Sequence, residues 1–188
     1  MRVVLLTLLS MLAFAANSLL CRLALKSGSI DPASFAAIRL ASGAAMLVLV
    51  MRVRRVSPVA HGSWAAAFWL FAYAATFSLA YVRLPAGVGA LLLFGAVQAT
   101  MVGAGLWRGE RLSHRQWLGL ALAMGGLVAL LLPGLSAPPL GSAALMLAAG
   151  VGWGAYSLHG KKAINAGAAT AGNFVRAVPL AALLVAVS

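Results

Sequence analysis

Long apolar stretches alternate with short polar connections along the whole chain. Each apolar stretch is close to 20 residues, and a helix of that length crosses roughly 30 Å of hydrocarbon. The sequence does not show the two-residue alternation that is typical of membrane β-strands. The pattern therefore predicts an all-α fold, a polytopic transmembrane helix bundle with spans at about 3–21, 33–51, 63–82, 85–107, 116–133, 140–158 and 169–187.

Short local signals mark several of these boundaries. Asp31-Pro32 is typical of a helix start, because aspartate caps free amide hydrogens and proline fits the first helical position. Pro85 opens the fourth span similarly, and Pro133-Gly134 closes the fifth. The first 18 residues have an alternative interpretation as a signal peptide cleaved after Ala13-Phe14-Ala15, which would leave six spans. The apolar run continues through Leu20, which favours a retained span.

Composition and charge agree with a membrane protein. Of the 188 residues 63% are hydrophobic and 9% are charged, too few polar side chains to cover a soluble domain. The net charge of +12 does not indicate nucleic-acid binding, because the basic residues cluster in short connections between spans. Most of them lie at 52–61, 108–116 and 159–167. Basic connections usually face the cytoplasm, so we expect the N-terminus to lie inside. The chain has eleven Arg and three Lys, and from this bias we expect a bacterial source and the inner membrane.

Two parts of the chain resemble each other. The stretch "AANSLLCRLAL" (15–25) aligns with "GAYSLHGKKAI" (154–164), and in the spans that follow Arg39 aligns with Arg176. The first copy begins at span one and the second at span six. Five spans separate the two starts, and because five is an odd number, the second copy would cross the membrane in the opposite direction to the first. Inverted repeats are the usual basis of alternating access, with the substrate site between the halves near the midplane.

Three motifs carry a resemblance to a known family. They are "WRGERLSHRQWLGLALAMGGLVALL" (107–131), "DPASFAAIRLASGA" (31–44) and "YVRLPAGVGALLLFGAVQATMVGAGL" (81–106). With them the chain resembles the EamA-type members of the drug/metabolite transporter superfamily. The motif at 107–131 matches that family's pattern at Gly109, Glu110, Arg111, Ser113, Gln116, Gly119 and Gly126. Where the family's fourth span usually has proline, this chain has Gln98.

The resemblance implies a domain organisation and a function. Members usually have ten spans in two inverted five-helix repeats. We therefore expect residues 1–134 to form the first repeat and 140–188 the start of a second, incomplete one. The implied function is secondary transport of a small polar metabolite by alternating access, with efflux favoured. The alternative is a non-transporting truncated protein, or a helix-packing partner without a substrate site.

Arg39 is the leading candidate for substrate binding, because a charged side chain near the bilayer centre costs about 2.5–3.5 kcal/mol. It either lines a cavity for anionic or zwitterionic substrates or extends to the interface and ties helices together. Arg176 has the same two interpretations. Gln98 and Asn17 either line the cavity or form interhelical hydrogen bonds. Trp153 and Tyr156 complete the candidate set, and packing is the alternative for both.

Other kinds of chemistry find little support in the sequence. Cys21 is the only cysteine, and no Cys/His spacing typical of a metal site occurs. The two carboxylates, Asp31 and Glu110, fall at helix ends. We therefore expect no enzymatic activity, no metal and no cofactor. The expected partners are a small-molecule substrate and the lipid bilayer, without nucleic acid. A homodimer or a missing C-terminal half would complete the bundle.

Overall fold

The computed structural model describes residues 2–57, 61–131, 138–161 and 163–188. Its described residues form helices and no strands, which confirms the predicted helical bundle. The helices are α1 (Arg2–Lys26), α2 (Pro32–Val53), α3 (Trp64–Tyr81), α4 (Ala86–Trp107), α5 (His114–Leu131), α6 (Leu140–Gly160) and α7 (Ala166–Val187). By length and composition α1, α2, α3, α4 and α7 are apolar enough to cross a membrane.

Side-chain caps explain where several helices begin. The Asp31 carboxylate accepts a hydrogen bond from the Ser34 amide at 2.8 Å and Pro32 follows it, so the predicted start of α2 is confirmed. Asn165 caps α7 in the same way through the Ala168 amide, at 3.0 Å. The predicted end of the fifth span at Pro133-Gly134 lies outside the described residues.

Helix α1 continues past its predicted end at Cys21 as far as Lys26. Arg22 lies within this extension, and its Nη1 donates to the carbonyl oxygens of Tyr81 (2.8 Å) and Val82 (2.7 Å). These carbonyls belong to the end of α3, where helical acceptors lack intrahelical partners. The cation is therefore held by the end of another helix, and α1 need not stop before it.

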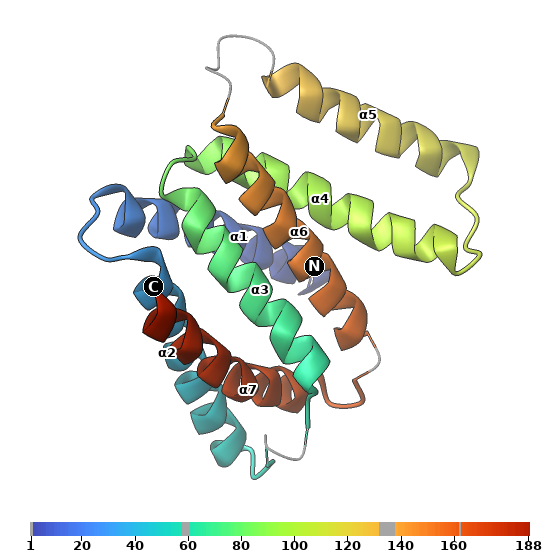
Figure 1. The fold of residues 1–188 in the computed structure, drawn as a ribbon. Helices are drawn as coiled ribbons and strands as arrows, with labels where there is room; N and C mark the ends of the chain where they lie inside the picture. Colours follow the sequence, from blue (N-terminus) through green and yellow to red (C-terminus); the bar gives the residue numbers. More distant parts are fainter. Residues whose placement is uncertain (1, 58–60, 132–137, 162) are drawn as a thin grey trace.

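Two packed units form the centre of the bundle. Helix α6 lies against both α3 and α4, and α2 lies against α7, with α3 joining the two units (Figure 1). Glycines permit the closest approach: a Cβ added at Gly150 of α6 would lie 2.6 Å from the Leu93 carbonyl oxygen of α4. Because α6 packs against two helices, its glycines Gly150, Gly152 and Gly154 are buried between them.

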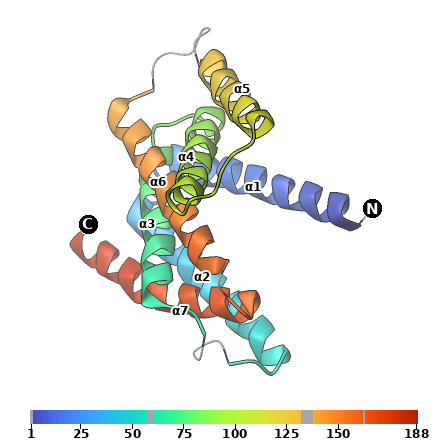
Figure 2. The ribbon, with the colours of Figure 1, turned by 90° about the vertical axis from the view of Figure 1, so that its right-hand side faces the viewer.

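Two helices lie at the periphery. The N-terminal half of α1 projects from the bundle (Figure 2), and most of its side chains are exposed. Its buried contacts come from the second half, where Ser18, Cys21 and Leu25 meet the core formed around α3. Helix α5 lies at the edge beside α4 (Figure 1). One side of α1 is therefore open.

Candidate functional site

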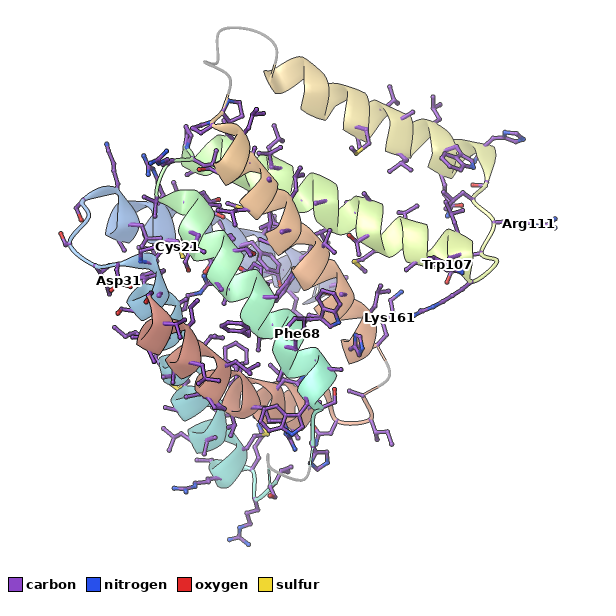
Figure 3. All side chains as sticks on the ribbon, viewed as in Figure 1. Cys21, Asp31, Phe68, Trp107, Arg111 and Lys161 are labelled. Carbon is purple, nitrogen blue, oxygen red and sulfur yellow. The ribbon has the colours of Figure 1, made fainter. Side chains whose placement is uncertain are left out.

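A cavity of about 420 Å³ lies where five helices meet. Its walls come from α1, α2 and α3 of the first predicted repeat copy and from α6 and α7 of the second. The lining residues are Ser10, Ala13, Phe14, Asn17, Arg39, Leu40, Leu70, Tyr73, Ala74, Trp153 and Phe174. Figure 3 shows Cys21 inside the bundle, whereas Trp107 and Arg111 lie at its outer edge.

The Arg39 guanidinium points towards the interior of the bundle. Its Nη2 donates to the Tyr73 hydroxyl at 3.0 Å, and its Nη1 donates to the Cys21 sulfur at 3.7 Å. The Arg39 Cζ lies 4.9 Å from the ring centroid of Phe77 and 5.4 Å from that of Tyr73, within cation–π range. These contacts hold the charge beside the cavity.

The Arg39 charge is not neutralised by its neighbours. Its partners are a phenol, a thiol and two aromatic rings, and no acidic residue is among those that line the cavity in the described part of the chain. Asp31 is engaged as the cap of α2, and Glu110 follows the end of α4. A charged side chain in the bilayer is unfavourable by about 2.5–3.5 kcal/mol on insertion scales, and the neutral partners of Arg39 do not remove its charge.

Aromatic rings line the cavity beside the guanidinium. The Trp153 ring lies 4.9 Å from Tyr73 and 6.1 Å from Phe14, centroid to centroid. When Ser18 is aligned with Ser157, Phe14 falls at the position of Trp153. Two residues at aligned positions of the predicted repeat therefore contact each other, and the repeat itself stays a prediction.

Three of the residues predicted for the site come together here: Arg39, Asn17 and Trp153. The Asn17 side-chain oxygen accepts a weak hydrogen bond from the Cys21 thiol, at 3.9 Å between heavy atoms. Tyr156 packs against Trp153 with 5.5 Å between ring centroids and is not among the lining residues. Direct contact with substrate stays a prediction for all four.

Gln98 lies apart from this group. It lines a crevice of about 460 Å³ between α4 and α5, where its neighbours are glycines and apolar side chains. Its side chain is exposed, and no described residue forms a hydrogen bond with it. The structure does not bring Gln98 and Arg39 into one cavity, so a shared role in binding stays a prediction without geometric support.

Arg176 also lies outside the cavity and has other partners. Its Nη1 donates to the carbonyl oxygens of His61 (2.7 Å) and Gly172 (3.0 Å). Nearby, the side-chain oxygen of Asn173 accepts from the Ser63 amide at 2.9 Å. Both side chains tie α7 to the segment that leads into α3. This arrangement corresponds to the second interpretation of the arginines, a tie between helices.

Several lining residues were not among the predicted set. They are Tyr73, Phe14 and Phe174, together with the neighbouring Cys21. Phe14 could have been predicted from the sequence, because the repeat alignment pairs it with Trp153. Tyr73 carries no comparable signal in the sequence.

Comparison with known proteins is consistent with this architecture. A model of the EamA-like transporter family matches residues 1–132. "Uncharacterized protein PA1977" of Pseudomonas aeruginosa is 59% identical over 184 residues, which cover 97% of this chain. The chain spans 64% of that relative's length. No solved structure matches the chain.

The family match extends over α1 to α5 and includes the arginine-bearing helix α2. The match covers more than half of the chain. Four of its helices, α1 to α4, are long and apolar enough to cross a membrane. Its members are membrane transporters, not enzymes. This chain is therefore a multi-pass membrane protein that belongs to the EamA-like transporter family.

Proposed function

We propose that this chain forms the substrate-binding part of a secondary transporter that exports a small polar metabolite across the bacterial inner membrane. The observation that carries the proposal is the position of Arg39, whose charge faces a cavity lined by helices of both repeat copies. A charged group among neutral and aromatic side chains of a membrane protein has a structural cost, and an anionic or partly anionic substrate would offset it. Membership of a transporter family supports the same function.

Alternating access is the mechanism that we propose for this cavity. Its walls come from α1, α2 and α3 of one predicted copy and from α6 and α7 of the other, so movement of one copy relative to the other would expose it to each face in turn. The basic connections that follow α2, α4 and α6 support an orientation with the N-terminus inside. In that orientation α2 begins at the outer face and α7 at the inner face.

The open side of α1 bears on how the site is completed. Its repeat counterpart α6 is covered by α3 and α4, whereas most α1 side chains are exposed. We propose that helices equivalent to α3 and α4 cover α1 in the working transporter. They would come from a second copy of the chain or from the additional length that its relative possesses.

The test uses the protein reconstituted in liposomes loaded with radiolabelled alanine, uridine, glucose, lactate or benzenesulfonate, which is a permanently charged aromatic monoanion. We expect efflux of at least one solute above that of protein-free liposomes. Arg39→Leu should abolish this efflux, whereas Arg83→Leu, a change at an exposed arginine after α3, should not. Equal efflux from the wild type and Arg39→Leu would remove Arg39 from the site. If no solute moves, the non-transporting alternative is favoured.

A further inference from the structure

We infer that the Arg39 cavity selects an organic monoanion built on a flat aromatic ring, an aromatic carboxylate in the simplest case. The inference rests on the proposed function, since it names the substrate class of the same site. It follows from two separate features of the cavity, its charge and the shape of its wall.

The charge of the cavity favours a monoanion over a zwitterion. Arg39 supplies one positive charge, and no lining residue in the described part of the chain supplies a negative one. A carboxylate would neutralise the guanidinium, whereas the ammonium group of an amino acid would find no acidic partner. A neutral molecule would leave the charge uncompensated. The best match is one negative charge without a positive one.

Arg39 also retains donors for such a carboxylate. A guanidinium has five N–H groups, and the described structure commits Nη1 to the Cys21 sulfur and Nη2 to the Tyr73 hydroxyl. Both acceptors are neutral, and the sulfur is a weak one. Hydrogen bonds from a guanidinium to a carboxylate are shorter and stronger than those to neutral acceptors. A carboxylate would therefore compete well for this group.

The wall of the cavity favours a flat ring. Phe14, Tyr73, Trp153 and Phe174 contribute four aromatic side chains to a lining of eleven residues. The rings support one another, because Trp153 contacts both Phe14 and Tyr73. They thus present a preformed surface, and ring faces and edges pair preferentially with other rings. A volume of about 420 Å³ is at the small end of ligand pockets and suits one or two rings.

The experiment measures equilibrium binding of radiolabelled benzoate to the purified protein in detergent. We expect saturable binding that unlabelled benzoate displaces. Benzamide (the neutral isostere), phenylalanine (ring plus zwitterion) and cyclohexanecarboxylate (anion without a flat ring) should each displace it at least about tenfold less well. Acetate should displace it least.

Matched variants connect the binding to the named residues. Arg39→Gln and Trp153→Leu should each weaken benzoate binding by at least about tenfold. Arg83→Gln and Trp107→Leu, at exposed positions, should leave it unchanged. Arg39→Lys keeps the charge and should bind more tightly than Arg39→Gln. Circular dichroism melting identifies any variant that fails to fold.

Each outcome bears on the inference. Displacement by benzamide or phenylalanine as effective as that by benzoate would overturn the charge argument, and equal displacement by cyclohexanecarboxylate would overturn the ring argument. Absence of saturable benzoate binding to the folded protein would overturn both. Benzoate binding without efflux of any solute from liposomes would leave the substrate class standing and remove the transport proposal.

Discussion

Helices α1 and α6 carry the same sequence motif and yet lie in opposite environments. Ser18-Leu19 of α1 corresponds to Ser157-Leu158 of α6, but α6 is packed between α3 and α4 while the first half of α1 projects from the bundle. At the position where α6 has Gly150, α1 has Met11, whose side chain is 64% exposed. The surrounding helices therefore decide whether residues at aligned positions are buried or exposed.

The two arginines of the repeat differ in the same way. Arg176 donates to backbone carbonyls of the segment before α3, so it holds two elements together. Arg39 instead contacts Tyr73, Phe77 and Cys21 at the cavity. If the predicted repeat is correct, one aligned position holds helices together in α7 and, on our proposal, faces substrate in α2. The following predictions test this difference.

The largest expected effect is on the packing of α6. Gly150→Val places side-chain atoms against the backbone of Leu93 and should lower the free energy of unfolding by about 3 kcal/mol. The matched change in α1, Met11→Val, should alter it by less than about 0.5 kcal/mol. Unfolding in mixed detergent micelles measures both. Equal losses would mean that α1 is as tightly packed as α6.

A smaller effect separates the two arginines. Arg176→Met removes charged hydrogen bonds to the carbonyls of His61 and Gly172 and should lower the free energy of unfolding by about 2 kcal/mol. Arg39→Met removes a charge without an acidic partner and should leave the free energy unchanged or raise it. The same titration compares them. A larger loss for Arg39→Met would assign Arg39 a structural role.

The smallest effect concerns the starts of α2 and α7. The Ser34 amide donates to Asp31 and holds the pKa of that carboxyl below its ordinary value. The cap therefore stabilises the start of α2 above the carboxyl's unfolded pKa and is lost as the pH falls through the lowered pKa of the folded state. Asn165, which caps α7, does not titrate.

Hydrogen exchange reads both caps in one experiment. After correction for intrinsic rates, protection of the Ser34 amide should decrease at acidic pH while that of Ala168 stays constant. Asp31→Asn should abolish the pH dependence at Ser34. A parallel decrease at both amides would indicate general acid unfolding and would contradict the local explanation.

Much of the fold could be predicted from the sequence because its signals are local. Apolar length predicted the helices, and Asp31-Pro32 marked the start of α2. The end of α1 was predicted too early because Arg22 reads as the end of an apolar run. Its helix continues because the carbonyls of Tyr81 and Val82 accept the guanidinium. Those partners are 59 and 60 residues away in the chain, so no local sequence pattern reveals them.

The site was less predictable because a span that is apolar all round gives no sign of which face is buried. Gln98 and Val97 are neighbours in α4, yet Val97 is buried with the core and Gln98 faces the crevice beside α5. The charge of Arg39 did single it out. Its aromatic neighbour Tyr73 emerged only from the packing of α2 against α3.

The central claim is that the two copies are inverted, and labelling single cysteines from each side of the membrane tests it most directly. In a Cys21→Ser background, Ser29→Cys precedes α2 and Ile164→Cys precedes α7, and both positions are exposed. An impermeant maleimide should label Ser29→Cys only from outside intact cells and Ile164→Cys only in inside-out vesicles. Labelling of both positions from the same side would contradict the inverted repeat.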